Sequence, residues 1–434
     1  MRTTSSYKVE ILRLHTPLKQ TMRICREAVK WLIPVIDTEW EELSKISGAK
    51  KRFDAAERLI HETEKNHAVY PFDDAFPKMP SYLRRAILQH VIGEVSSYRT
   101  RTGMQTDAKL PADGETHYMP VFYRDNMYRK NEDRVSLKLY NGKDWVWQDI
   151  FLKKTDLDYL RKYWTGIEAK SPVLVKRNRK YYLQFAFEKD VPLRQIKDGD
   201  ARICAVDLGI NTDAVCSIMD ADGTVAARRF ITFGAEKDRL NHVLNRIRKK
   251  QRDHGPESVQ GFWAYAKRLN EELARKTAGE IVRFAVEHGA DVIVFEHLEI
   301  HGKLRGKNRQ RLRMWKHQSI QKLTEHKAHL HGLRVSRVSG RNTSALAFDG
   351  SGKVRRDPGN HSLAVFTNGK QYNCDLSASY NIGARYFLRE LIKPVPVTER
   401  SVLAAKVPAV QRRTSCVYAD LLKLRALLEE KEIA

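Results

Sequence analysis

The strongest constraint on the fold of this chain is a series of three strand patterns that begins near residue 200. The first is RICAVDLGI, and it is followed at the short intervals of a meander by AVCSIMD and TVAARRFIT. Because the first pattern is apolar through its centre, it is typical of a strand that is buried on both faces. The second half of the chain is therefore expected to contain a layered α/β domain.

The residues that follow supply helices and a further strand. The segments 236–252 and 261–288 both carry apolar residues at helical spacing, and Gly289 is expected to end the second helix. Another buried strand is predicted for DVIVFEHLE. The expected order is three consecutive strands, helices, a strand, a helix and a further strand. An RNase H-like α/β domain needs this order.

Three acidic residues of this region lie at the ends of apolar segments. Asp207 ends the strand ICAV, Glu296 ends the strand DVIVF, and Asp375 precedes the helical segment SASYNIGARYF. Acids often end strands, so one alone would be weak support, but three in a basic chain favour a common site. Converging carboxylates bind Mg²⁺, and two ions about 3.5–4 Å apart activate water and stabilise the leaving oxygen of a phosphodiester. We expect a catalytic site with two Mg²⁺ ions at these residues, with Mn²⁺ as a substitute.

The charge of the chain indicates a polyanionic partner. Its 434 residues include 78 Lys and Arg against 53 Asp and Glu, a formal net charge of +25. Such a surplus favours nucleic acid, through phosphate neutralisation and counterion release. An anionic membrane is the alternative, but no apolar run approaches about 18 residues, and a basic helix with an inserting apolar face is missing. We expect a nucleic-acid-binding protein of the bacterial cytoplasm.

Two basic segments are the expected contacts to phosphates. The stretch 300–324 contains no Asp or Glu and follows Glu296 almost directly, which is typical of a flexible lid or of a strand-guiding segment that contacts phosphates. A second cluster ends the predicted helix 236–252. A solvated surface is the alternative for either one. The residues expected to bind nucleic acid are Lys303, Arg305, Lys307, Arg309, Arg311 and Arg313 in the first segment and Arg246, Lys249 and Lys250 in the second.

The N-terminal half changes from a helical period to a period of two. Residues 38–108 are mostly helical and charged, whereas 118–192 alternate as strands with a hairpin turn at Asn141-Gly142. A nucleic-acid cradle and an ordinary barrel with a solvated basic face are both open. The prediction is a β-barrel-like module over 1–16 and 115–198 with a helical insertion over 17–114.

The three acids lie within the segments DLGIN, FEHLE and YNCDLSASYNIGARY. Together these segments resemble the split RuvC nuclease motifs of transposon-encoded TnpB proteins and compact type V CRISPR effectors, over about residues 200–390. The resemblance implies that Asp207, Glu296 and Asp375 are metal ligands, and that the protein cleaves DNA under the direction of a bound guide RNA. It also implies that the β module is the wedge, that the helical insertion is the recognition domain, and that both hold the guide scaffold and the guide–target heteroduplex.

The chain departs from that family between the second and third motifs. The family commonly carries a four-cysteine zinc ribbon there, after a Thr-Ser pair; Thr343-Ser344 is present, but Cys374 is the only cysteine that follows in this segment. A closed zinc site needs about four soft or imidazole ligands. We therefore expect no structural zinc. Instead, 341–374 is expected to form a target-strand-loading β-hairpin, with ALAFD and SLAVFT as strands and a turn at Asn368-Gly369.

The expected protein is a multidomain, RNA-guided, Mg²⁺-dependent DNA endonuclease with one RuvC site. Its nuclease domain is predicted over 199–340 and 375–392, followed over 393–434 by a linker and a C-terminal helix. The expected partners are a guide RNA and a double-stranded DNA target, without a membrane partner, and a monomer is favoured. Two alternatives are an RNA-guided repressor with little cleavage and an RNA-independent junction resolvase. The source of the guide, a transposon end or a CRISPR array, stays open.

Overall fold

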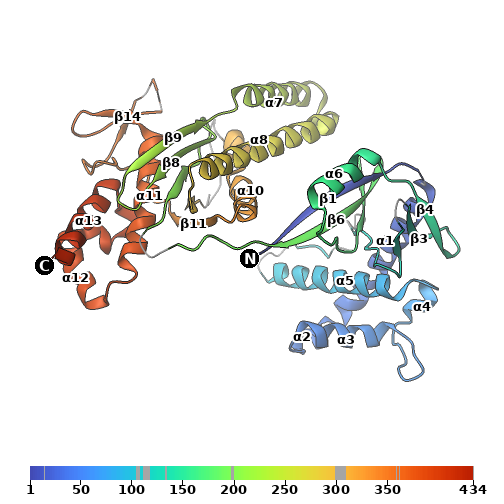
Figure 1. Ribbon diagram of the computed structural model, residues 1–434. Helices are drawn as coiled ribbons and strands as arrows, with labels where there is room; N and C mark the ends of the chain where they lie inside the picture. Colours follow the sequence, from blue (N-terminus) through green and yellow to red (C-terminus); the bar gives the residue numbers. More distant parts are fainter. Residues whose placement is uncertain are drawn as a thin grey trace. The chain divides into compact units, whose positions relative to one another are not determined.

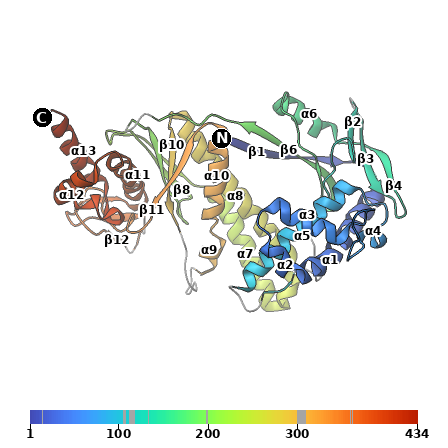
Figure 2. The ribbon, with the colours of Figure 1, turned by 90° about the horizontal axis from the view of Figure 1, so that it is seen from below.

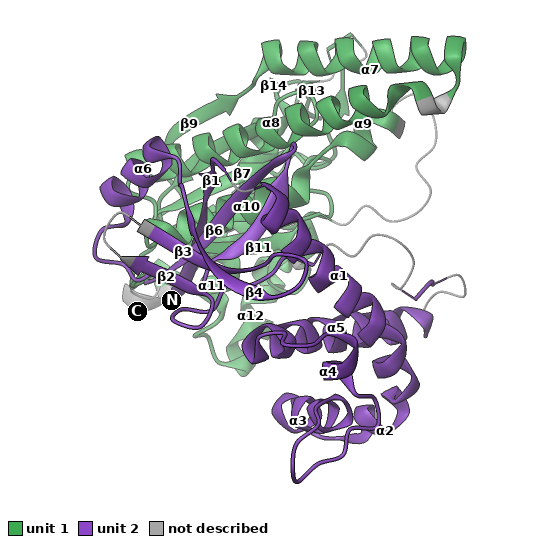
Figure 3. Ribbon diagram, turned by 90° about the vertical axis from the view of Figure 1, so that its right-hand side faces the viewer, with its two compact units in different colours: residues 1, 190–434 green, residues 2–189 purple. Residues whose placement is uncertain are grey.

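The chain folds into two compact units, residues 2–189 and residues 190–434 with Met1 (Figures 1 and 3). Each unit has its own hydrophobic clusters. In the described part of the chain, none of the helices combines the length and the apolar composition needed to span a bilayer. The computed structural model describes residues 1–13, 15–103, 108–110, 118–131, 134–196, 200–298, 309–357, 359–360 and 362–433.

Helices make up most of residues 15–103, after the first strand of the unit 2–189. The longest helix of this unit, α1 (His15–Thr38), buries one apolar face that runs from Leu18 through Cys25 to Ile36, as the helical spacing of these residues requires. This face packs against the helix that follows Pro80, which lies within the region 38–108 that the sequence predicts as mostly helical. The helices are α1 (His15–Thr38), α2 (Trp40–Lys45), α3 (Ala49–Ile60), α4 (Phe72–Ala75), α5 (Ser81–Thr102) and, further along the chain, α6 (Lys154–Trp164).

The strands of this unit form two three-stranded sheets, in the orders β1–β6–β5 and β2–β3–β4. A bridge between Ile11 and Leu152 joins the two sheets, but strand pairing among the described residues does not by itself close a barrel. The hairpin at Asn141-Gly142 is confirmed, because β3 and β4 pair antiparallel across it. The strands are β1 (Arg2–Ile11), β2 (Tyr128–Asn131), β3 (Arg134–Tyr140), β4 (Trp145–Ile150), β5 (Val173–Arg177) and β6 (Lys180–Asp190).

The unit 190–434 is built on a five-stranded sheet with the order β11–β10–β7–β8–β9. The strands β7, β8 and β9 form the predicted antiparallel meander, whereas β10 lies parallel to both β7 and β11. Every residue of β7 and β8 is buried, as expected from their apolar sequences. The strands are β7 (Ile203–Asp207), β8 (Ala214–Met219), β9 (Val225–Ile231), β10 (Val292–His297) and β11 (Arg334–Ser339).

Helices cover both faces of this sheet (Figures 1 and 2). Alternate residues of β7 enter different cores: Ile203 and Ala205 pack with α11, and Cys204 and Val206 pack with α8 and α10. The predicted end of α8 is confirmed, since Gly289 follows it with a φ of 68°. The helices are α7 (Gly234–His254), α8 (Gln260–Glu287), α9 (Arg309–Met314), α10 (His317–Leu330) and α11 (Cys374–Ile392).

The segment expected as a linker after α11 is helical, and that expectation is wrong. Pro396 and Pro408 stand at the starts of helices, where a missing amide proton costs nothing, rather than in extended chain. Leu403 and Leu421 share a core with α11, which is therefore buried on nearly all sides. The elements are α12 (Val397–Lys406), the 3₁₀ turns η2 (Pro408–Val410) and η3 (Arg413–Ser415), and the expected terminal helix α13 (Tyr418–Ile433).

The insertion 341–374 contains a three-stranded sheet, β12–β13–β14, rather than a two-stranded hairpin. The turn at Asn368-Gly369 is confirmed between β13 and β14. ALAFD is not a strand of this sheet, because tight turns follow it at Gly350 and Gly352 and its Phe348 enters an aromatic cluster. The absence of structural zinc stays a prediction. The strands are β12 (Arg355–Arg356), β13 (Leu363–Val365) and β14 (Gln371–Asn373).

Candidate carboxylate site

Two of the predicted acids meet where β7 and β10 end. The parallel register pairs Val206 with Phe295, so the next residues along the two strands, Asp207 and Glu296, lie side by side. Asp207 is 9% exposed and Glu296 is 6% exposed. Their carboxyl groups share a hydrogen bond, which requires a proton on one of them. The sequence placed these acids at strand ends, and the register brings them into contact.

Burial and mutual repulsion dominate the electrostatics of this pair of acids. Burial raises the pKa of Asp207 well above its usual range, and the negative charges of Glu296 and Asp375 raise it further. Burial also raises the pKa of Glu296, although hydrogen bonds with Asp207 and Thr343 oppose this effect. Two buried acids in contact resist joint ionisation, and a divalent cation between them would remove that cost.

The third acid, Asp375, comes from the first turn of α11. Asn373 caps this helix, since its Oδ1 accepts a hydrogen bond from the Leu376 amide at 2.9 Å. The Cys374 thiol donates to Asp375 Oδ1 at 3.4 Å. Asp375 lies near enough to affect the pKa of Asp207. Within the described ranges, however, no group of three or more Asp, Glu, His or Cys side chains is close enough to hold one ion. The structure thus joins two acids and leaves Asp375 beside them.

The backbone approaches Glu296 so closely at Gly340 that a Cβ there would force the Glu296 carboxylate to move. A Cβ at this position would lie 2.6 Å from Glu296 Oε2 and 3.3 Å from Glu296 Cβ. The Thr343 hydroxyl donates to the Gly340 carbonyl at 3.0 Å and also reaches the Glu296 carboxylate. On the other side, Gln321 Nε2 donates to the Glu296 carbonyl at 2.8 Å. The sequence did not predict these supports of Glu296, although it contains the Thr343-Ser344 pair after which the zinc ribbon of the similar family begins.

A basic residue that the sequence did not single out lies beside the acids. Arg356, on β12, acts electrostatically on Asp207 and on Cys374, and lowers the pKa of each against the larger effect of burial. Its neighbour Arg355 is also exposed, but successive side chains of a strand point to opposite faces. The insertion therefore brings one exposed cation to the edge of the sheet where the acids lie.

Part of the predicted basic stretch falls outside the described residues, namely Lys303, Arg305 and Lys307. For Arg309 and Arg311 only the helical backbone of α9 is described, whereas Arg313 is exposed on that helix. The predicted phosphate contacts of this stretch stay predictions.

The second predicted cluster is exposed on α7. Arg246 and Lys250 lie over the ring of Phe262 from α8, at 5.0 and 5.1 Å from its centre. Lys249 is exposed beside them. We call Arg246, Lys249 and Lys250 the α7 basic surface. The Phe262 ring contacts two of the three cations of this surface, so packing restricts the positions of their head groups.

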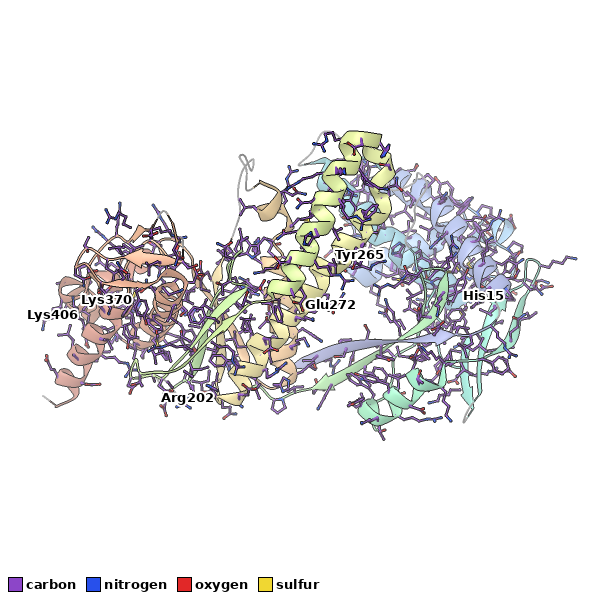
Figure 4. The ribbon with its side chains drawn as sticks, turned by 90° about the horizontal axis from the view of Figure 1, so that it is seen from above. His15, Arg202, Tyr265, Glu272, Lys370 and Lys406 are labelled. Carbon is purple, nitrogen blue, oxygen red and sulfur yellow. The ribbon has the colours of Figure 1, made fainter. Side chains whose placement is uncertain are left out.

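The neighbouring part of the α7–α8 pair repeats this arrangement. Arg239 and Arg268 lie over the ring of Tyr265, at 5.5 and 5.8 Å from its centre. Figure 4 labels Tyr265 on α8. Arg248 Nε donates to Gln310 Oε1 of α9 at 2.8 Å. Next to the α7 basic surface, α7 is thus attached to α9, which lies within the basic stretch 300–324.

Comparison with known proteins gives matches in sequence and in fold. A model of the Aq_aa04 family matches residues 4–141. A TnpB-like protein of Aquifex aeolicus (strain VF5) is 26% identical over 170 residues, which are 35% of this chain and 55% of the relative. The match thus spans about half the length of that curated relative. Among solved structures, the protein of a Cas12f1–sgRNA–target DNA complex has a TM-score of 0.53 at 12% identity, over 77% of this chain and 74% of the other.

These matches confirm the resemblance that the three motifs indicate. The chain is similar in sequence to a TnpB-like protein, and its fold is similar to that of Cas12f1.

Replacing Asp207 with an uncharged isostere is expected to stabilise the metal-free protein. The folded state raises the pKa of Asp207, so ionisation of this residue at neutral pH costs folding free energy. In EDTA, Asp207→Asn should therefore melt a few degrees above the wild type. Excess Mg²⁺ should raise the melting temperature of the wild type and leave that of Asp207→Asn nearly unchanged. Differential scanning fluorimetry measures both shifts.

The matched control for this prediction is Asp220→Asn. Asp220 pairs with Arg202 at 2.6 Å near the surface, so its loss should not raise the melting temperature. A lower melting temperature for Asp207→Asn in EDTA would show that repulsion between the acids is not a significant cost.

Proposed function

We propose that this chain is an RNA-guided DNA endonuclease with a single RuvC-type site at Asp207, Glu296 and Asp375. The observation that carries the proposal is the approach of three acids, from β7, β10 and α11, at the carboxyl ends of two inner strands of a mixed five-stranded sheet. The fold shared with Cas12f1 and the sequence similarity to a TnpB-like protein support it.

The donor chemistry of the site suits Mg²⁺, with Mn²⁺ as a substitute. Carboxylate oxygens are the hard ligands that these ions prefer, and Asp207 and Glu296 already carry an excess of buried negative charge. Two ions at such a site lower the pKa of the attacking water and stabilise the leaving oxygen of the phosphodiester. With two ions and three carboxylates, a single ion would not need all three acids as ligands. Asp375 would therefore not have to contact both Asp207 and Glu296.

The proposed partners are a guide RNA and double-stranded DNA. The net charge of +25 and the α7 basic surface support a polyanionic partner. The Cas12f1 structure of similar fold is a complex with sgRNA and target DNA. In RNA-guided effectors generally, base pairing reads the sequence while the protein recognises the backbone of the heteroduplex. We assign this holding role to the wedge and recognition modules within 2–189, in a monomeric protein of the cytoplasm.

The decisive experiment is to express the chain with its native flanking DNA and to sequence the RNA that copurifies. A discrete RNA with a constant scaffold and a variable end is expected, and the purified complex should cut a plasmid that matches the variable end in Mg²⁺. Binding without strand scission would favour the repressor. Protein that is free of RNA and cuts branched DNA would favour the junction resolvase.

The acids are expected to be needed for cutting but not for RNA binding. Asp207→Ala, Glu296→Gln and Asp375→Ala should each reduce plasmid cleavage to background, because each removes a ligand of the ions. RNA binding, measured by filter retention, should stay close to that of the wild type. Asp220→Ala, an acid of the same unit that pairs with Arg202, should keep full activity. Cleavage that persists in any of the three variants would exclude that residue from the site.

Arg356 is expected to contact the phosphate that is being cut. Its exposed guanidinium lies on the insertion beside Asp207, where it can neutralise charge that develops on the phosphate. Arg356→Ala should slow single-turnover cleavage by about 10- to 1,000-fold without changing RNA binding. Arg355→Ala is the control, since its side chain points to the other face of β12. Equal effects of the two substitutions would contradict this assignment.

The α7 basic surface is expected to make phosphate contacts that depend on salt. Combined substitution of Arg246, Lys249 and Lys250 by Gln should weaken DNA binding and flatten its logarithmic salt dependence by about 0.9 for each lost contact. Lys276→Gln is the control, because Lys276 pairs with Glu236 at 2.6 Å. Fluorescence anisotropy over a salt series measures the slope. An unchanged slope would show that the α7 basic surface is an ordinary solvated helix surface without phosphate contacts.

A further inference from the structure

A buried arginine of α11 joins the carboxylate site to the C-terminal segment. Arg385 is 4% exposed, and its guanidinium donates to four backbone carbonyls. Nη1 reaches Ser339 at 2.6 Å and Arg341 at 2.8 Å. Nε reaches Cys416 at 3.1 Å, and Nη2 reaches Thr414 at 3.0 Å. The planar fork of arginine therefore connects two segments that are distant in sequence.

The first of these segments is the turn that fixes Glu296. Ser339 and Arg341 flank Gly340, whose missing side chain leaves the backbone in contact with the Glu296 carboxylate. Arg385 binds the carbonyls on both sides of Gly340, so a shift of this guanidinium would shift the backbone that limits where Glu296 can lie. The positive charge of Arg385 also lowers the pKa of Glu296 against the larger effect of burial, but the hydrogen bonds of Arg385 position that carboxylate only through the turn.

A second polar residue of α11 repeats the connection. Asn381 is fully buried, and its Nδ2 donates to the carbonyls of Thr343 at 2.9 Å and Leu346 at 3.0 Å. Its Oδ1 accepts a hydrogen bond from the Tyr418 amide at 3.0 Å. Because Thr343 reaches the Glu296 carboxylate, Asn381 also connects a support of Glu296 with the C-terminal segment.

The C-terminal segment is itself fixed at several points. The Tyr418 hydroxyl donates to the Gly223 carbonyl at 2.6 Å, and the Ala419 amide donates to the Phe348 carbonyl at 2.9 Å. Leu421 and Leu424 are fully buried in the core that contains α11. The carbonyls that Arg385 binds are therefore held by the rest of the unit and do not move freely with the guanidinium.

We propose that residues 414–418 form a brace of the nuclease site, and that Arg385 is the positioning residue through which this brace fixes Glu296. The same helix carries Asp375 at its start, so α11 and the brace together set the spacing between Asp375 and Glu296. The inference rests on the proposed function for its link to cutting. The test also measures Mn²⁺ binding and the hydrogen exchange of backbone amides, and neither measurement depends on cleavage.

The test compares Arg385→Lys with Arg389→Lys in the full chain. Lysine keeps the charge of Arg385 but has one compact head group in place of the fork, so it cannot hold both segments in the same geometry. Arg389 lies one turn further along α11 and donates to the Arg337 carbonyl at 3.3 Å and to Ser336 Oγ at 2.9 Å, away from the turn at Gly340. The control thus makes the same chemical change on the same helix.

Arg385→Lys is expected to weaken Mn²⁺ binding by about 10-fold or more, as measured by the free-Mn²⁺ signal in electron paramagnetic resonance. Hydrogen exchange should increase in peptides that cover 339–346 and 414–418 together. Arg389→Lys should change neither. Increased exchange at 414–418 with unchanged Mn²⁺ affinity would overturn the positioning role, because Arg385 would then support only the fold.

A second variant keeps the inference testable if Arg385→Lys does not fold. Gly340→Ala adds a Cβ against Glu296 Oε2 and leaves the brace intact, so it should weaken Mn²⁺ binding without raising exchange at 414–418. Unchanged Mn²⁺ affinity in this variant would also overturn the inference. Wild-type protein that binds Mn²⁺ but cuts no DNA would overturn the proposed function alone. Wild-type Mn²⁺ binding that Glu296→Gln does not weaken would overturn both.

Discussion

Parallel pairing between β7 and β10 places the ends of two buried strands side by side, and the candidate site depends on this register. Asp207 and Glu296 are far apart in sequence, and only the ladder brings them into contact. A slip of one residue would turn Glu296 to the opposite face of the sheet. The apolar strands supply the burial that fixes the register, and the same burial makes the two acids costly to ionise. Burial of the two strands therefore both stabilises the sheet and raises the cost of ionising the two acids.

The third acid depends on how closely α11 approaches that sheet. A Cβ at Gly383 would lie 2.9 Å from Met219 Cε, so a larger residue where the helix crosses β8 would force the Met219 side chain to move. Ala378 and Ala384 are likewise small and fully buried. A helix this apolar requires cover on its outer side too, and α12, η2 and α13 supply it. The position of Asp375 is therefore determined by packing on both sides of one helix.

The sequence predicted features that depend on local periodicity. The meander, the strand that carries Glu296 and the helix that begins at Asp375 all follow from apolar spacing and turn residues, and the structure confirms them. Contacts between distant segments carry no such periodicity, so Gly340, Arg356 and Arg385 were missed. The linker prediction failed for a related reason. A proline at a helix start and a proline in extended chain look alike until the packing partner is known.

The insertion shows how far this dependence on distant packing extends. Its strands are two or three residues long, which is too little to be stable alone. Phe348 anchors it instead, with ring contacts to Tyr380 of α11 at 5.3 Å and to Tyr418 at 6.1 Å. Arg356 stands on this insertion and Arg385 on α11, so residues around Tyr418 support the cation beside Asp207 as well as the turn beside Glu296. The acidic and basic sides of the site therefore share one support, and a change at the C-terminal segment should affect both at once.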